Sequence, residues 1–581
     1  MSKIAIIEEE RKVDPSKFDK VISFCRDGYP NVDNYIVEDD SYRIADQVYL
    51  ELDSWLKQDG MNSNFVYQDI DILHAYRKKI FNFLSNFYQK IHIAKKIIEK
   101  ESPSEIWVAK ASVESNSKYP FLSMFLPDFV SPDISIRYFE DLPAKKSNSI
   151  NPKKLKLYPI RFILDLIRRF SNIVNQSKAD NILICSDLEK IPTIMGYFKK
   201  ENVIFMREDF PERLVFYLIG NCVSLRLFSD FKVSGKHRES VSDVKNDFIR
   251  KLNNLLPDKS VSGVNFTPYV KKFLAVIWQK DLMLVLMRAA QINSLFGKFK
   301  MKSLLVDEDS GVFTNILVQT AKKYQCMSYV NCHSEPFHKN GIVPLTADYI
   351  LVWGKSQKEL LMNWGMEESK IIVTGCSKYD KYIRVSSESI KAKICGDLGF
   401  NVSRPVGLIA TCPLKKRRNV LENTLWQEIK QVIVTASSFP DIQIIIKLHP
   451  GDYNEPFVRD LVKNLNSDKV KVLRNYDPLA LAKGVDFLIV CASTFTIDGL
   501  AYGKPVILTY NRCMKRYKDL GVFYDGTGNE KLKNSIEGIL NGSYRGHMIN
   551  WESAVNYCLD GMDGLASERI AGILQKGYKK Q

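Results

Sequence analysis

Residues 486–509 read DFLIVCASTFTIDGLAYGKPVILT, and this stretch decides the fold class. An apolar run ends at Val490, and a segment with helical character follows before a second apolar run at 505–509. Ser493 or Thr494 is suited to cap the start of the helix, and Gly503 to end it. A strand, a helix and a strand in this order predict two parallel strands of a buried sheet.

The same alternation extends over the whole C-terminal half of the chain. The run at 442–448, IQIIIKL, is almost continuously apolar, as a strand covered on both faces requires. Helical patterns separate the apolar runs, so we expect a parallel sheet with crossover helices. The strands expected here lie at 349–353, 370–374, 406–411, 442–448, 469–473, 486–490 and 505–509.

A second region of this kind precedes residue 345. Strands are expected at 181–185, 203–206, 303–306 and 328–331, with a long helix at about 268–296. The chain is therefore predicted to be an α/β protein with two Rossmann-like, doubly wound lobes that face a central cleft, plus additional N-terminal elements. The domains expected are an N-terminal lobe at 1–345, in which 1–150 is a separate subregion and 180–345 is Rossmann-like, and a C-terminal lobe at 346–581 whose last helices cross back to the first lobe.

Within the subregion 1–150, strands are expected at 4–7, 20–24 and 105–109, and helices at 42–58 and 72–100. The stretch 143–156, rich in Lys, Ser, Asn and Pro, is typical of a linker.

The composition bounds the class of protein. The chain has 581 residues, 45% hydrophobic and 26% charged, too long for one core and ordinary for a globular protein. Eleven scattered cysteines suit a reducing compartment, so we expect a cytoplasmic protein. The net charge of +16 fits a phosphorylated substrate or an anionic membrane. No nucleic-acid-binding module is recognisable, so nucleic acid is not expected as a partner.

The segment 159–170, PIRFILDLIRRF, combines an apolar face with paired arginines. This pattern fits peripheral contact with an anionic membrane at the inner face of the cell membrane, and equally an ordinary helix facing the core.

Two polar turns are predicted to form a phosphate site. His449 ends the strand at 442–448, and the Pro450–Gly451 turn holds it at the edge where ligands of such sheets bind. Its imidazole can donate a hydrogen bond to a phosphate oxygen. The helix that starts near Ser493 and Thr494 offers free backbone N–H groups for the same anion. The alternative interpretations are a structural histidine and simple helix capping.

Asp498 lies one turn into that helix, where a carboxylate suits ribose hydroxyls or a charged neighbour. Lys447 precedes the histidine in the KLHP turn. Thr411 ends the first strand of the C-terminal lobe, and Lys415 follows it in the basic run of the next loop. We expect Lys447, Thr411 and Lys415 to assist in binding the donor phosphates, although a solvated basic run is an equally good interpretation of Lys415.

The KLHP turn, followed some forty residues later by Ser-Thr-x-x-x-Asp-x-x-x-x-Gly-Lys-Pro-Val, resembles the donor lobe of GT-B glycosyltransferases of bacterial surface polysaccharide synthesis. This group includes Kdo transferases, sialyltransferases with an HP motif, and CDP-glycerol polymerases of teichoic acid synthesis. The segments 344–354 (PLTADYILVWG) and 370–380 (KIIVTGCSKYD) resemble its lobe junction. The resemblance covers residues 300–510. It implies that His449, with Pro450, and Ser493 and Thr494 hold a nucleotide phosphate.

The general base is expected in the other lobe. The run 304–311, LLVDEDSG, places Asp307, Glu308 and Asp309 at the end of a strand, and it is similar to the acidic motif that supplies the base in HP-motif sialyltransferases. An attacking hydroxyl must lose its proton, so a carboxylate facing the donor is required. The alternative is helix capping by Asp309 or Ser310.

The next strand ends in NCHSEP, where many relatives have Gln-His-Gly. His333 matches that motif, whereas Ser334 replaces the glycine. Glu335 becomes a second acidic candidate, for acceptor binding or as the base. Asp69 and Asp71 form a literal D-x-D, which we interpret as surface because no buried strand precedes it.

The predicted function is transfer of a glycosyl group from a nucleotide-activated sugar, with CMP-Kdo or a CMP-sialic-type sugar favoured, to a surface polysaccharide or lipid-linked glycan. The reaction is expected to be inverting, with no metal and no cofactor, because a helix start, histidine and lysines handle the phosphate charge. Two alternatives stay open. One is a CDP-glycerol-type polyol-phosphate transferase, in which His333 is the better base. The other is a catalytically silent GT-B scaffold in a polysaccharide assembly complex.

Overall fold

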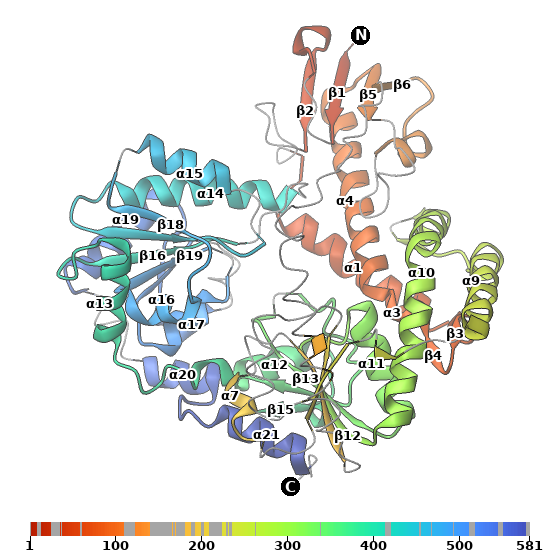
Figure 1. Ribbon diagram of the computed structural model, residues 1–581. Helices are drawn as coiled ribbons and strands as arrows, with labels where there is room; N and C mark the ends of the chain where they lie inside the picture. The colour runs from red at the N-terminus through yellow and green to blue at the C-terminus, as the bar shows by residue number, and fades with distance from the viewer. Residues whose placement is uncertain are drawn as a thin grey trace.

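The computed structural model gives the arrangement of helices and strands (Figure 1). It describes residues 2–8, 13–24, 35–36, 38–58, 61–109, 122–139, 165–166, 169, 180–186, 192–198, 203–207, 224–227, 230–231, 235–261, 263–336, 338–412, 420–451, 455–465, 467–491, 493–509, 517–543 and 550–576. The expected linker at 143–156 and most of the basic segment 159–170 lie outside these residues, as does Lys415.

The first lobe is built on a parallel sheet with the order β15-β14-β13-β12-β7-β8-β9. Counted from β7 along the chain, this is the order 3-2-1-4-5-6-7, in which the direction of winding reverses between β7 and β12. Ligands of doubly wound sheets bind at such a reversal. The strands are β7 (Asn181–Cys185), β8 (Val203–Arg207), β9 (Ser224–Leu227), β12 (Met301–Val306), β13 (Met327–Asn331), β14 (Tyr349–Val352) and β15 (Ile371–Val373).

The second lobe, at the left of Figure 1, has a parallel sheet with the order β18-β17-β16-β19-β20-β21, or 3-2-1-4-5-6. Its winding reverses between β16 and β19. Its elements are β16 (Val406–Ala410), β17 (Gln443–Lys447), β18 (Val470–Leu473), β19 (Phe487–Val490), β20 (Val506–Leu508), β21 (Phe523–Asp525), α13 (Ser387–Leu398), α14 (Val420–Ser437), α15 (Glu455–Asn464), α16 (Pro478–Gly484), α17 (Phe495–Ala501) and α19 (Asn529–Leu540).

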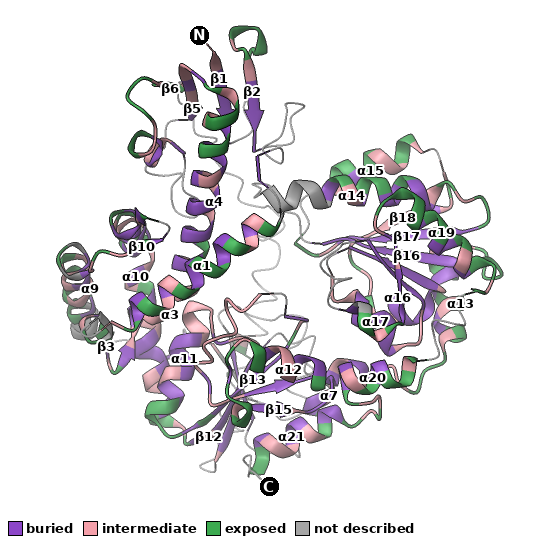
Figure 2. Cartoon of the chain, turned by 180° about the vertical axis from the view of Figure 1, so that it is seen from behind, coloured by how far each residue is buried: buried purple, intermediate pink, exposed green. Residues whose placement is uncertain are grey.

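The predicted α/β class, with two Rossmann-like lobes and additional N-terminal elements, is confirmed. The inner strands of both sheets are almost wholly buried, as Figure 2 shows in purple, because helices cover both faces. Every strand expected between residues 349 and 509 is present within one or two residues of its expected bounds. β9 and β21 were not expected from the sequence, because SLRL and FYD are too short to show a clear apolar pattern.

The expected boundary at residue 345 falls inside the first sheet. β14 and β15 follow that residue in the chain, yet β14 pairs with β13 and β15 pairs with β14. The chain passes to the second sheet only between β15 and β16. Sequence alternation alone could not place this change, since strands and helices continue without interruption across it.

The last two helices connect the second lobe back to the first. α20 (Trp551–Leu559) packs against α12 (Lys355–Asn363) and α17, and α21 (Ala566–Lys576) packs against α7 (Pro192–Met195) and β12. Gly354, at the start of α12, permits the close approach of α20: a Cβ there would lie 2.4 Å from the Cys558 carbonyl carbon. The hydroxyl of Ser303 in β12 donates to the backbone carbonyl of Leu574.

The N-terminal part of the chain forms a third, smaller parallel sheet with the order β2-β1-β5-β6 (top of Figure 1). Its helices lie between this sheet and the first lobe. The elements of this part and the remaining helices of the first lobe are β1 (Lys3–Ile7), β2 (Lys20–Ser23), α1 (Glu38–Leu56), α2 (Met61–Asn64), β3 (Val66–Tyr67), β4 (Ile70–Asp71), α3 (Ile72–Ala75), α4 (Arg77–Glu101), β5 (Glu105–Ala109), β6 (Ser135–Phe139), α9 (Gly235–Leu255), β10 (Ser260–Val261), β11 (Val264–Asn265), α10 (Thr267–Lys298) and α11 (Val312–Lys323).

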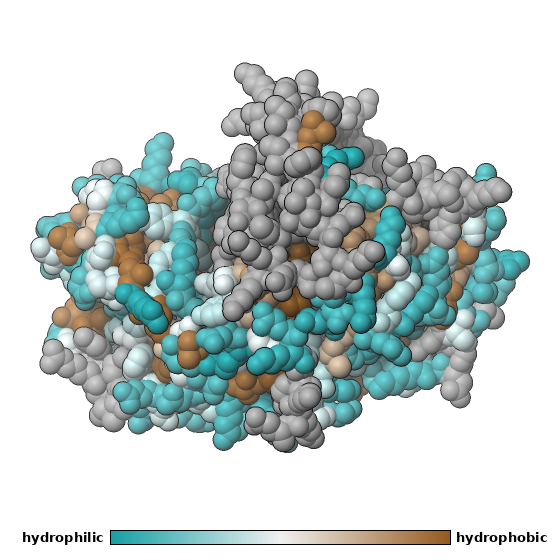
Figure 3. Space-filling model, turned by 60° about the horizontal axis from the view of Figure 1, so that its bottom comes forward, coloured by the Kyte–Doolittle hydropathy of each residue, from teal (hydrophilic) through white to brown (hydrophobic). Residues whose placement is uncertain are grey.

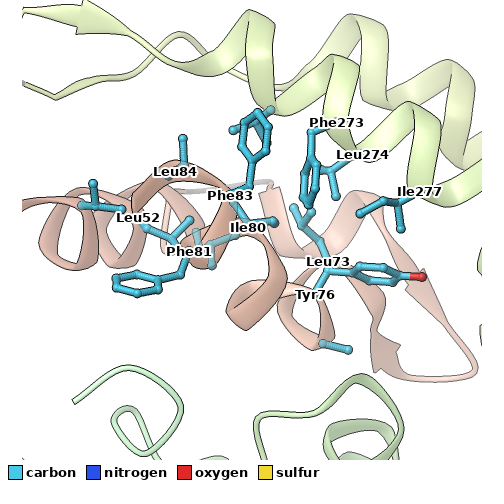
Figure 4. Packing of buried hydrophobic residues seen from close by; sticks show 14 of the residues in the cluster. Leu52, Leu73, Tyr76, Ile80, Phe81, Phe83, Leu84, Phe273, Leu274 and Ile277 are labelled. Carbon is cyan, nitrogen blue, oxygen red and sulfur yellow. The ribbon is translucent and has the colours of Figure 1, made fainter. Parts of the chain in front are cut away.

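An aromatic core joins α4 to α10 (Figure 4). The rings of Phe83 and Phe273 stack with centroids 4.3 Å apart, and Tyr76 meets Trp278 edge-on. Such pairs add to the free energy gained by burying the rings. This core fixes the start of α4, and with it Lys78, above the first lobe.

On the face drawn in Figure 3, the residues that the structure describes are mostly hydrophilic, with smaller apolar areas between. Among the helices that the structure describes, none combines the length and the apolar character of a membrane span.

Candidate functional site

In the first lobe, two predicted site residues, Asp307 and His333, and a third polar residue, Ser186, each follow one of three adjacent strands. Ser186 follows β7, Asp307 follows β12 and His333 lies just beyond β13. β7 and β12 flank the reversal of the sheet, and parallel strands end at the same edge. The structure therefore brings Asp307 and His333 together at the position where this fold binds ligands.

His333 is exposed, and its orientation is fixed through one ring nitrogen. Its Nδ1 lies 2.9 Å from the backbone carbonyl oxygen of Asp307. A carbonyl oxygen can only accept, so Nδ1 carries the proton. In the neutral ring Nε2 then bears the lone pair, which is the form needed to accept a proton.

The three neighbouring carboxylates are each held by other groups. The Ser186 hydroxyl donates to Asp307 Oδ1. Lys78 Nζ lies 2.5 Å from Glu308 Oε2 and also donates to the Ser310 hydroxyl. Burial acts to raise the pKa of Glu308, but Lys78, helped by Ser310 and His333, brings the pKa below its ordinary value.

Asp309 is only 2% exposed. Its Oδ2 accepts the backbone N–H groups of Thr346, at 2.5 Å, and Ala347, at 2.9 Å. Burial raises its pKa to about 6, against the lowering effect of these hydrogen bonds. Its visible role is to hold the loop that leads into β14.

Glu335, expected on the acceptor side, is buried in the interior near the junction of the lobes. The Gln357 side chain donates to Glu335 Oε2 at 2.7 Å and accepts the backbone N–H of Trp353 at 2.9 Å. Glu335 thus helps to position the end of β14.

In the second lobe, the predicted phosphate residues follow three adjacent strands. Thr411 follows β16, His449 lies beyond β17, and Ser493 and Thr494 come between β19 and α17. The structure therefore gathers these four at one sheet edge, around the reversal between β16 and β19.

The orientation of His449 is fixed by the turn that follows it. Its backbone N–H donates to the Thr411 hydroxyl at 3.1 Å, and its Nδ1 accepts the backbone N–H of Gly451 at 3.0 Å. Because Nδ1 accepts, the proton of the neutral ring is on Nε2. His449 is thus a hydrogen-bond donor at Nε2, the opposite of His333.

Ser493 and Thr494 are both half-buried. Thr494 occupies the N-cap position of α17, but its side chain makes no capping hydrogen bond. The hydroxyl of Ser493 instead accepts the backbone N–H of Phe495 at 3.4 Å, a long contact. The Thr494 hydroxyl is therefore not committed to capping.

Lys447 is buried, and it contributes to the shape of the turn. Its Nζ donates to the backbone carbonyls of Leu448 and Arg474, at 3.0 and 2.9 Å. Burial, together with the charge of Arg474, lowers its pKa. Arg474 in turn donates to the carbonyl of Pro450 at 2.8 Å and pairs with Glu455 at 2.5 Å. Sequence reasoning missed Arg474, because nothing in the RNYD segment indicates a contact with a turn 24 residues earlier.

Asp498 was expected to contact either ribose hydroxyls or a charged neighbour, and in the structure it pairs with the charged side chain of Lys378. Its Oδ1 lies 2.6 Å from Lys378 Nζ and accepts the Tyr379 hydroxyl at 2.7 Å. The ammonium of Lys378 also lies 4.8 Å from the centroid of the Trp353 ring, at the end of β14. These contacts join the strand-end edge of the first lobe to α17 of the second.

The two aspartates of the D-x-D pair lie in different environments. Asp69 is exposed and forms an ion pair with Lys323 at 3.0 Å, as expected for a surface residue. Asp71 is half-buried and caps α3 by accepting the backbone N–H of His74 at 2.8 Å. Within the described residues, no group of three or more His, Cys, Asp or Glu side chains is arranged to hold a metal ion.

Similar chains are found among solved structures. No protein-family model matches the chain, and neither does any curated protein sequence. Among solved structures, it is similar to a UDP-N-acetylglucosamine 2-epimerase (TM-score 0.44, 13% identity, 70% of this chain and 98% of that one). It is also similar to the UDP-GlcNAc 2-epimerase from Neisseria meningitidis bound to UDP-GlcNAc (0.42, 16%, 69% and 100%). A third is the wall teichoic acid polymerase TagF (0.41, 11%, 74% and 98%).

Proposed function

We propose that this protein is a metal-independent, inverting transferase that moves a sugar from a nucleotide-activated donor to a surface polysaccharide or a lipid-linked glycan. The observation that carries the proposal is the pair of strand-end histidines whose backbone contacts fix opposite tautomers. One lobe presents a proton acceptor and the other a proton donor, each after the strand next to the reversal of its sheet.

The donor binds to the second lobe in this proposal. His449 donates from Nε2 to a phosphate oxygen, and the Thr494 hydroxyl adds a second donor. Lys447 and Arg474 hold the turn in shape through hydrogen bonds to backbone carbonyls. Stabilising the leaving phosphate in this way lowers the barrier for departure from the anomeric carbon.

The acceptor hydroxyl loses its proton to His333 Nε2 as it attacks. Asp307 holds the imidazole through its backbone carbonyl rather than through its carboxylate. Among the candidates for the base, His333 is the exposed one, whereas Asp309 and Glu335 are buried and Glu308 is paired with Lys78. One base and no nucleophile give a single displacement with inversion.

The sequence pattern favours CMP-Kdo or a CMP-sialic-type donor. The second candidate is polyol-phosphate transfer from a CDP-glycerol-type donor, in which His333 Nε2 serves as the base in the same way. We place the enzyme in the cytoplasm at the inner face of the membrane, where its net charge of +16 suits anionic lipid.

Calorimetric titration with CMP, CDP and UDP tests the donor site. We expect a cytidine nucleotide to bind, and His449→Ala to weaken that binding about tenfold, the cost of one charge-assisted hydrogen bond. His333→Ala should bind the nucleotide normally and lose transfer. Absence of binding by all three nucleotides would favour the scaffold alternative, and transfer retained by His333→Ala would return the role of base to a carboxylate.

A further inference from the structure

The second lobe contains a cavity that the proposed reaction does not use. It lies between α14 and α19, beyond the carboxyl ends of β20 and β21, and has a volume of about 500 Å³. Thr509, which lines it, donates its backbone N–H to the carbonyl of Val490 at the end of β19. The cavity therefore shares a sheet edge with the phosphate site but lies one strand further out.

The lining of this cavity combines neutral polar side chains with apolar ones. Amides and hydroxyls lie beside the apolar carbon of Val432, Val434 and Leu532. Each of these groups can both donate and accept a hydrogen bond. The amide and hydroxyl residues are Gln427, Gln431, Thr435, Thr509 and Asn529.

Part of the lining is preorganised. The Thr435 hydroxyl, on buried Thr435, donates to Asn529 Oδ1 at 2.6 Å, which joins α14 to α19 and fixes the amide. Gly528 precedes α19 with φ +84°, a conformation that favours glycine, and a Cβ there would have no heavy atom within 4 Å.

The charge of the cavity argues against a second phosphate site. Among the lining residues, Glu428 and Lys430 are of opposite sign, and the Glu428 carboxylate accepts the Cys491 thiol at 3.7 Å. A nearly neutral set of two-way hydrogen-bonding groups over apolar carbon matches the faces of a sugar ring. The volume lies within the range of small-molecule sites.

We infer that this cavity is a binding site for a neutral saccharide, separate from the donor site. The identification of the ligand as a unit of the acceptor glycan rests on the proposed function. The saccharide site itself depends only on the lining described above.

Ligand-detected NMR tests the inference on the full chain. Saturation transfer to glucose, N-acetylglucosamine and lactose is measured with and without saturating CDP. We expect transfer to at least one of these sugars, and we expect it to persist when CDP is present. No transfer to any of the three, or complete loss of transfer with CDP, would overturn a separate saccharide site.

Paired variants locate the site. Gln427→Ala/Gln431→Ala changes two exposed residues of α14 and should weaken sugar binding about tenfold. Asn534→Ala, an exposed residue of α19 outside the lining, is the matched control and should bind as the wild type does. Equal binding by the α14 variant and the control contradicts the inference. His449→Ala should lose nucleotide and keep sugar binding, so that failure of the donor site and failure of this site are distinguishable.

Discussion

At the scale of single residues, the site depends on hydrogen bonds from side chain to backbone. His333 and His449 each use one ring nitrogen on the main chain, which leaves the other nitrogen with a defined role. Asp309 and Arg474 use the same device to hold loops. Backbone partners of this kind give the reacting groups fixed positions without adding further charge to the site.

Asp309→Ala should lower the free energy of unfolding by about 2 kcal/mol, because two buried backbone N–H groups lose their acceptor. Urea denaturation measures the loss. Glu308→Ala, at a half-buried neighbour that pairs with Lys78, is the comparison and should cost less. Equal losses from the two variants would show that Asp309 does not support the loop.

Stability should depend on pH through the same residue. The pKa of Asp309 is raised to about 6 from 3.8, so the folded protein binds this proton more tightly than the unfolded chain. Its contribution to stability is present in full below about pH 4 and is lost as pH rises through 6. The difference in unfolding free energy between wild type and Asp309→Asn should therefore fall across pH 4–6. A difference that rises with pH would contradict this assignment.

Arg474→Ala should weaken nucleotide binding about tenfold, since the turn that carries His449 loses its hydrogen bond at Pro450. Arg459→Ala is the control. It removes a cation that pairs with the same Glu455, at 2.6 Å, but does not contact the turn. Titration with the nucleotide that the wild type binds gives the result, and equal weakening by both variants would point to charge rather than to positioning.

At the scale of elements, close packing of helix on helix links the lobes. The start of α12 meets the end of α20 at Gly354, where a side chain would collide with backbone atoms of Cys558. Backbone cannot give way as a flexible side chain can, so the glycine is required for α20 to occupy its place.

Gly354→Ala should lower the free energy of unfolding by about 2 kcal/mol or more, the cost typical of overpacking. Gly396→Ala in α13 is the matched control, because a Cβ there meets nothing within 4 Å. It should be neutral or stabilising by up to about 1 kcal/mol, as alanine favours the helix. Thermal denaturation of both variants would decide, and a harmless Gly354→Ala would mean that α20 can shift.

At the scale of the whole molecule, a buried ion pair lies where the lobes meet. Lys378 and Asp498 have side chains only 22% and 4% exposed. Asp498→Ala should cost about 3–5 kcal/mol, because it leaves the ammonium buried without its partner. Lys355→Ala removes an exposed ion pair with Glu359 and should cost less than about 1 kcal/mol. Chemical denaturation distinguishes the two, and a small loss for Asp498→Ala would show that water or Trp353 replaces the partner.

Local pattern was sufficient for much of this architecture. Apolar runs such as IQIIIKL predicted the strands, and strand ends predicted where Asp307, His333, His449 and Ser493 gather. The contacts between Lys78 and Glu308, and between Lys378 and Asp498, could not be predicted, because they join residues 230 and 120 positions apart. The tautomers of the two histidines depend on the geometry of the neighbouring turns, which the sequence does not specify. That β14 and β15 belong to the first sheet is visible only in their hydrogen-bonded pairing with β13 and with each other.

The return of α21 to the first lobe has a consequence for biosynthesis. Ile570, Ala571 and Leu574 complete the hydrophobic cluster over β7, β12 and β13, where Ile184, Leu305 and Tyr329 are fully buried. While the ribosome is still translating the second lobe, that face of the nascent sheet has no cover from α21. A stop codon introduced before residue 566 would leave this apolar surface open to aggregation even though every predicted catalytic side chain is present.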